Sequence, residues 1–186
     1  MEEENRHPIV TFIGHVNHGK TTLIEKICNI PIVNKEIGKI TQNIETYFIT
    51  TQFGKLTILD TPGHEAFFNM RLRGIKCTDI VILVIAADDG ITEQTKEIIS
   101  YITKEKLPLI ITINKIDKTK KNIEKITAEL LKYNISDEKW GGNTFFIQTS
   151  AILNIGIKKL IETIYLQAEF LKLKKNEKES PEGIVI

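Results

Sequence analysis

The sequence predicts an α/β domain in which helices cover both faces of a mostly parallel six-stranded sheet. Short apolar runs rich in β-branched residues alternate along the chain with stretches of helical period. Polar motifs follow the ends of those runs, which is where parallel sheets bind their ligands. The length of 186 residues suits a single domain with a sizeable core. Strands that alternate with helices in this way are joined as parallel neighbours by crossover helices.

The first elements are a strand, a loop and a helix built around a phosphate-binding motif. Residues 8–13 form an apolar run, and residues 22–28 have helical spacing. Between them, Gly-His-Val-Asn-His-Gly-Lys-Thr at 14–21 fits the pattern G-x-x-x-x-G-K-[ST]. Backbone N–H groups of such a loop, with the positive end of the helix, cradle the phosphates of a nucleotide. The predicted phosphate-binding residues are Val16, Asn17, His18, Gly19, Lys20, Thr21, Thr22 and, from the next motif, Gly63.

A second motif follows the third predicted strand. A long polar loop at 29–42 leads to strands predicted at 44–51 and 55–60, and the latter ends in Asp-Thr-Pro-Gly. An acidic residue beside a phosphate loop anchors Mg²⁺, so Asp60 is a candidate metal anchor together with the Thr21 hydroxyl. Gly63 brings a backbone N–H close to a γ-phosphate because no side chain intervenes.

The remaining elements continue the alternation. A short helix is predicted to begin at His64, and the continuous apolar run at 79–87 predicts a central strand covered on both faces. The later elements are a helix at 92–105, a strand at 107–113, a helix at 121–133, a strand at 144–148 and a helix at 155–171.

A third motif, Asn-Lys-Ile-Asp at 114–117, selects the base. The Asp117 carboxylate can accept hydrogen bonds from guanine N1–H and the exocyclic amine, a pair of donors that adenine lacks. Alone, this tetrapeptide is equally compatible with an ordinary turn after a strand. After the other two motifs, in this order, it predicts a guanine nucleotide. The predicted guanine-binding residues are Asn114, which ties this loop to the phosphate loop, Lys115, whose stem covers the base, Asp117, Ser150 and Ala151, whose N–H meets guanine O6.

Composition narrows the class of protein and its location. The net charge of +1 gives no global basic field of the kind that nucleic-acid binding produces. No apolar run has the length of a membrane span and the N-terminus is not a signal peptide, so we expect a cytoplasmic protein without a membrane partner. We also expect a monomer. Lysine greatly outnumbers arginine, a bias that leaves an organelle matrix or plastid stroma as the alternative location.

At these motifs the chain resembles the translational GTPases, a group of P-loop GTPase domains. The narrower resemblance is to the G domain of bacterial-type translation initiation factor two. It rests on Asp-Thr-Pro-Gly-His-Glu-Ala-Phe at 60–67, Ala-Ala-Asp-Asp-Gly at 86–90, Trp-Gly-Gly at 140–142 and Leu-Gln-Ala-Glu at 166–169. It implies an N-terminal extension at 1–7, a GTP-binding domain at 8–171, and at 172–186 a linker and the start of a following β-barrel domain.

The resemblance also implies roles for individual residues. Lys20 would bind the β- and γ-phosphates, and Thr21 and Thr41 would ligate Mg²⁺ with Asp60 holding its hydration shell. His64 would be the catalytic residue that positions the water attacking GTP, which gives GDP and phosphate. Val16 and Ile40 would form an apolar gate beside it. Large-subunit rRNA of the ribosome would trigger hydrolysis during subunit joining, and initiator tRNA would bind only through a domain outside this chain.

The sequence departs from the family pattern at three places. Asn17 stands where the family usually has aspartate, which removes a negative charge beside a monovalent cation that the resemblance implies, although an amide oxygen still offers a ligand. The loop at 38–46 has a single glycine before Ile-Thr, and Ile152 replaces a common lysine. None of the arginines stands where a finger in cis is expected, so turnover without a partner should be slow.

Two alternatives remain open from the sequence. One is a guanine-nucleotide binding and interaction module without appreciable hydrolysis, which the altered loop and Asn17 motivate. The other is the G domain of another translational GTPase, such as an elongation or selenocysteine factor. The Trp-Gly-Gly and Leu-Gln-Ala-Glu stretches argue against the second alternative.

Overall fold

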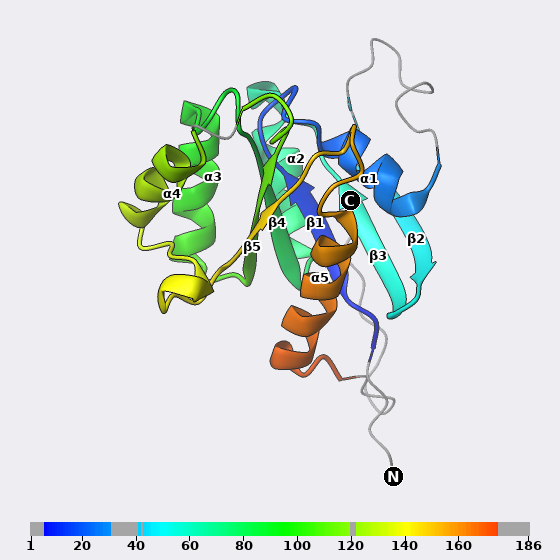
Figure 1. Cartoon of the computed structure of the whole chain (residues 1–186). Helices are drawn as coiled ribbons and strands as arrows, with labels where there is room; N and C mark the ends of the chain where they lie inside the picture. The colour runs from blue at the N-terminus through cyan, green and yellow to red at the C-terminus, as the bar shows by residue number, and fades with distance from the viewer. Residues whose placement is uncertain (1–5, 31–40, 42, 120–121, 175–186) are drawn as a thin grey trace.

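A six-stranded sheet forms the centre of the computed structural model, which describes residues 6–30, 41, 43–119 and 122–174 (Figure 1). Its strand order is β2-β3-β1-β4-β5-β6, and every pairing is parallel except that of β2 with β3. The strands are β1 Ile9–Ile13, β2 Glu45–Thr51, β3 Gly54–Asp60, β4 Ile80–Ala86, β5 Leu109–Asn114 and β6 Phe145–Gln148. The predicted fold class is therefore confirmed.

Helices cover both faces of this sheet. Apolar residues of α1 and α5 pack on one face, and those of α2, α3 and α4 pack on the other (Figure 1). The helices are α1 Lys20–Cys28, α2 Phe68–Lys76, α3 Glu93–Lys104, α4 Ile123–Leu131 and α5 Ile157–Leu171, with short 3₁₀ turns η3 Glu65–Phe67 and η4 Glu138–Trp140. None of the described helices combines the length and apolarity needed to cross a membrane.

The burial of each strand follows from its place in the sheet. Every residue of β4 is buried, because β1 and β5 flank it and helices lie on both of its faces. The edge strand β2 instead alternates between half-buried and exposed residues, and Phe48 on it is 78% exposed. The order of the strands places the ends of β1, β3, β4 and β5 beside one another, and the three motifs follow the ends of β1, β3 and β5.

Local signals account for most element boundaries. The helix predicted at 92–105 begins at Glu93, because the Thr92 hydroxyl caps it by accepting the Thr95 N–H at 3.3 Å. The helix predicted to begin at His64 starts one residue later as η3 and continues as α2 to Lys76. The turn η4 was not predicted. Most of the loop predicted at 29–42 lies outside the described residues.

Candidate nucleotide-binding site

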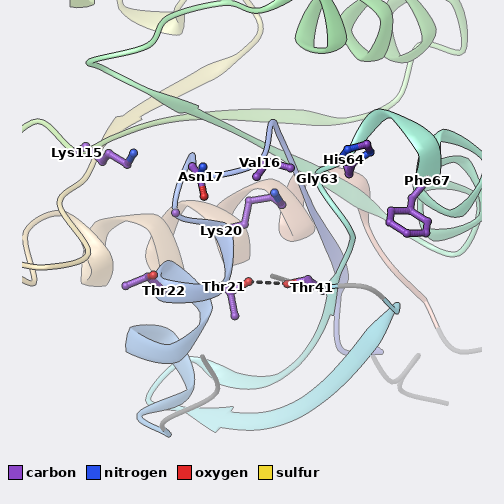
Figure 2. A pocket seen from close by; sticks show the side chains of 11 residues that line it. Val16, Asn17, Lys20, Thr21, Thr22, Thr41, Gly63, His64, Phe67 and Lys115 are labelled. Atoms are coloured by element: carbon purple, nitrogen blue, oxygen red, sulfur yellow. Dashed lines mark hydrogen bonds between the residues drawn. The ribbon is translucent and has the colours of Figure 1, made fainter. Parts of the chain in front are cut away.

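A cavity of about 370 Å³ lies where the phosphate loop meets the segment after β3 (Figure 2). Ten of the residues predicted for the site line this cavity, and Phe67 joins them. The predicted lining residues are Val16, Asn17, Gly19, Lys20, Thr21, Thr22, Thr41, Gly63, His64 and Lys115. Lys115 lies at one side of the cavity and His64 with Phe67 at the opposite side (Figure 2). Ile40, the predicted partner of Val16 in an apolar gate, lies outside the described residues.

The phosphate loop joins β1 to α1 with two residues in the left-handed region of backbone conformation. Gly19 has φ 84° and precedes the first residue of α1, and Asn17 has φ 64°. Asparagine and aspartate both tolerate this conformation, so the change to asparagine keeps the backbone of the loop. The Lys20 ammonium donates to the carbonyl oxygens of Gly14 and His15, each at 3.0 Å, and the side chain projects into the cavity (Figure 2). The loop thus presents its lysine where a phosphate would enter.

Gly63 shows how closely the end of β3 approaches the phosphate loop. A Cβ atom at Gly63 would lie 2.6 Å from the Lys20 Nζ and 2.7 Å from the backbone nitrogen of Val16. Backbone cannot move aside as a flexible side chain does, so a residue with a side chain would displace the two segments. Gly63 therefore lies close to the phosphate loop, as its predicted place beside the γ-phosphate requires.

The three predicted metal-binding residues form one cluster of oxygen atoms. The Thr21 hydroxyl lies 2.8 Å from the Thr41 hydroxyl (Figure 2). It donates to the Asp60 carboxylate at 2.9 Å. The Thr41 hydroxyl lies 3.4 Å from the same carboxylate oxygen, and Thr41 and Asp60 are both buried. Hydroxyl and carboxylate oxygens are hard donors of the kind that Mg²⁺ prefers, so these residues fit that ion.

Asn114 connects the third motif to the phosphate loop. Its amide nitrogen donates to the carbonyl of His18 at 3.0 Å. Its amide oxygen accepts the Thr149 hydroxyl at 3.1 Å and the Ala151 N–H at 3.3 Å. The side chain is almost completely buried, so it acts as a bridge between the loops. The Ala151 N–H, which we expected to meet guanine O6, here donates to Asn114.

The other predicted guanine-binding residues lie beside this bridge. The buried Ser150 hydroxyl donates to the carboxylate of the exposed Asp117, which orients that carboxylate. The Lys115 ammonium lies 3.7 Å from the carboxylate of Asp88, which also accepts from Lys118 at 2.7 Å. The hydrogen bond from Lys118 holds the pKa of Asp88 below its usual range. The two loops that follow β5 and β6 thus meet, with Asp117 at their exposed edge.

We expect Asn114→Ala to destabilise the chain by about 2–4 kcal/mol, because it leaves buried groups of both loops without their partner. Urea denaturation followed by circular dichroism measures the change in the free energy of unfolding. Asn143→Ala is the matched control, since Asn143 is exposed, and it should change the free energy by less than about 0.5 kcal/mol. Equal effects of the two substitutions would contradict the bridging role.

His64 is exposed, and one of its ring nitrogens is already engaged. Its Nδ1 accepts the Ala66 N–H at 3.1 Å, so in the neutral ring the proton resides on Nε2. The ring also lies edge-on to Phe67, with 6.2 Å between the ring centroids. The backbone and the aromatic ring thus orient His64 with Nε2–H as a hydrogen-bond donor.

Sequence reasoning missed Arg71, which holds the backbone around His64. Its guanidinium donates to the carbonyls of His64 and Pro62, and it lies 5.5 Å from the centroid of the Phe68 ring. Arg71 is only 1% exposed, and this burial lowers the pKa of its guanidinium. A buried arginine is costly, and nothing in the local sequence distinguishes Arg71 from the exposed Arg73 of the same helix. Phe67 was also missed, although it follows His64 within one turn.

The fold and the site define a GTP-binding domain of the translational type. Residues 33–169 match the family model described as the elongation factor Tu GTP binding domain. Because this match spans more than half of the chain, the chain belongs to that family. The predicted GTPase class is thereby confirmed.

Within this class, the chain is similar to translation initiation factor IF-2 sequences. It is 50% identical over 181 residues to IF-2 of Buchnera aphidicola subsp. Schizaphis graminum, covering 97% of this chain and 21% of that protein. The chain thus spans about a fifth of the length of the curated relatives it matches. The predicted resemblance to initiation factor two is confirmed.

Solved structures of related factors share the fold at lower identity. The bacterial selenocysteine-specific elongation factor EF-Sec superposes with a TM-score of 0.73 at 28% identity, covering 89% of this chain and 29% of that one. GDP-bound aIF5B from Aeropyrum pernix superposes with a TM-score of 0.72 at 26% identity, covering 94% and 38%. The higher identity to IF-2 than to the selenocysteine factor favours the initiation-factor reading over that alternative.

Proposed function

We propose that this chain is the GTP-binding and GTP-hydrolysing switch domain of a translation initiation factor. The observation that carries the proposal is the joining of three motifs at one edge of the sheet. Thr21, Thr41 and Asp60 meet through hydrogen bonds, and Asn114 bonds the third motif to the phosphate loop. The IF-2 relatives support the assignment to initiation.

Each group of residues has a task in nucleotide binding. The N–H groups of 16–22 and the Lys20 ammonium bind the phosphates, with Gly63 at the γ-phosphate. Asp117, oriented by Ser150, reads the guanine edge, and Lys115 covers the base. Thr21 and Thr41 would hold Mg²⁺ and Asp60 its water shell, and the bound ion would supply charge neutralisation at the γ-phosphate. The Asn17 amide oxygen offers a ligand to a monovalent cation.

Hydrolysis proceeds by in-line attack of water on the γ-phosphate, without a covalent intermediate. Because Nδ1 of His64 accepts from Ala66, the ring faces the water through Nε2–H. His64 therefore orients the water and stabilises charge as a donor, rather than removing a proton. The exposed position of His64 explains why this arrangement needs a partner to bring the ring to the phosphate.

The partner is the ribosome, whose large-subunit rRNA places His64 during subunit joining. The segments that carry Thr41 and Gly63 order with the γ-phosphate and relax after hydrolysis, which makes the domain a timer. Initiator tRNA binds through another domain of the whole factor, which residues 172–186 would join to this domain of 8–171. The chain works as a cytoplasmic monomer.

Phosphate release from GTP, with and without ribosomes, tests the proposal on a longer protein that includes the downstream domains. We expect slow release alone and strong stimulation by ribosomes. Tight GTP binding without ribosome-stimulated phosphate release would overturn the proposed hydrolysis and favour the alternative of a guanine-nucleotide binding module. Asn17 is the observation behind that alternative, because the loss of a negative charge beside the phosphates weakens a binding site for a monovalent cation.

We expect Arg71→Met to slow ribosome-stimulated phosphate release by about 10-fold or more, because a misplaced reacting group is costly. The melting temperature should change little, since removing a buried charge offsets the loss of the two hydrogen bonds to the Pro62 and His64 carbonyls. Arg73→Met is the matched control, because Arg73 is an exposed residue of the same helix. A collapse of the melting temperature with unchanged phosphate release would contradict the positioning role of Arg71.

A further inference from the structure

The side chains of two histidines and an aspartate form a cluster at the phosphate loop, and none of the three lines the cavity of the proposed GTP site. His15 and His18 belong to the loop, and Asp89 follows β4. One potential ligand atom of each residue lies within 4.8 Å of the other two. The His18 Nε2 is 3.0 Å and the His15 Nδ1 3.8 Å from the same oxygen of Asp89.

The hydrogen bonds of His18 require a cation at its Nε2. The Nδ1 lies 3.1 Å from the carbonyl oxygen of Val84, which can only accept, so Nδ1 carries a proton. In a neutral ring, Nε2 then has a lone pair, which would face the carboxylate of Asp89 at 3.0 Å. Two lone pairs repel at that distance. Either a second proton or a metal ion must therefore lie between them.

Burial weighs against the second proton. The side chain of His18 is fully buried, so a charged ring there would lose its hydration. The neighbouring His15, with 5.2 Å between the ring centroids, would be repelled by a charged ring. The Nδ1 of His15 is itself buried and has no hydrogen-bond partner among the described residues. Two imidazole nitrogens and one carboxylate oxygen thus lie close together, and none of them supplies a proton to the others.

We propose that His15, His18 and Asp89 form a binding site for a divalent transition metal ion of the zinc type. Two nitrogens and one oxygen suit zinc, cobalt or nickel, whereas Mg²⁺ prefers oxygen alone. The Val84 carbonyl fixes the tautomer of His18, as acceptors behind metal-bound histidines do. Small side-chain shifts bring the three atoms to metal distance, and water takes the fourth position because Asp89 is half exposed.

This ion would clamp the phosphate loop to the connection between β4 and α3. His18 is the residue whose carbonyl accepts from Asn114, and the carbonyl of His15 accepts from Lys20. The clamp would therefore restrain the phosphate loop, whose backbone positions both Lys20 at the phosphates and Asn114 of the guanine-binding motif. Bound metal should raise the melting temperature, since it binds the folded chain and the separated ligands of the unfolded chain bind it weakly.

Titration of the metal-free chain with Co²⁺ tests the site without nucleotide. A four-coordinate site with nitrogen ligands gives intense visible absorption, which an all-oxygen six-coordinate site does not. We expect one Co²⁺ per chain, saturating absorption and its loss when Zn²⁺ displaces the cobalt. No saturable absorption would overturn the proposal and leave a proton on the Nε2 of His18.

Substitutions locate the ion. His15→Asn and Asp89→Asn each remove one ligand at a partly exposed position, and each should weaken Co²⁺ binding by about 100-fold or more. The matched control His7→Asn changes an exposed histidine outside the cluster and should leave the affinity unchanged. Far-UV circular dichroism confirms that each variant is folded. Unchanged affinity in both His15→Asn and Asp89→Asn would place the ion elsewhere and overturn the proposal.

Discussion

His64→Ala is expected to reduce ribosome-stimulated phosphate release by about 100- to 1,000-fold, the loss that follows removal of one aligned donor from a developing charge. GTP affinity should stay the same, because the ring is exposed and its fixed contacts are to Ala66 and Phe67. Single-turnover phosphate release on saturating ribosomes measures the first quantity. Equilibrium titration with GTP measures the second.

The control for this variant is His7→Ala, which removes another exposed histidine. It should leave both quantities unchanged. His64→Gln offers a sharper test of the donor role, since its amide N–H can replace Nε2–H in part. If His64→Ala and the wild-type chain respond equally to ribosomes, His64 does not position the water.

Asp117→Ala is expected to weaken GTP binding by about 100-fold or more, because each hydrogen bond to the charged carboxylate contributes about 1.5–3 kcal/mol. Inosine triphosphate lacks the exocyclic amine and so retains only one of the two bonds. The wild-type chain should therefore prefer GTP to inosine triphosphate, and the variant should bind the two equally. Competition against a fluorescent GDP analogue measures all four affinities.

Glu138→Ala serves as the matched control, since Glu138 is an exposed acidic residue of η4. It should preserve both the affinity and the preference. A variant at Asp117 that still prefers GTP would show that other groups read the base edge. The base would then be selected by the loop that carries Ser150 and Ala151 instead.

Periodicity was enough to predict the sheet and its helices. The apolar run that became β4 is buried along its whole length, and the stripe Ile98, Ile99 and Ile102 of α3 faces the core. Motif spacing was enough to predict that Asn114 ties two loops together, because the carboxyl ends of parallel strands share one edge. The contact from Asn114 to His18 spans 96 positions of sequence, yet the motif pattern encodes it.

Contacts made by residues outside the motifs could not be predicted from the sequence. Arg71 reads as one of several surface charges on a helix, and only the path of the chain after β3 buries it beneath His64. Asp89 reads as the end of a strand, and the pairing of β4 with β1 brings it to His18. The Ala151 N–H was assigned to the base, but Asn114 competes for it because both groups are buried together.

The most direct measurement is calorimetric titration of this chain with GTP and with ATP, each in Mg²⁺ and again in EDTA. The site described above predicts one GTP per chain, bound at least about 1,000-fold more tightly than ATP because the guanine edge has matched partners. It also predicts that EDTA weakens GTP binding through the loss of the ion at Thr21, Thr41 and Asp60. Equal affinity for GTP and ATP, or GTP binding that EDTA leaves unchanged, would contradict a guanine-nucleotide site built from these three motifs.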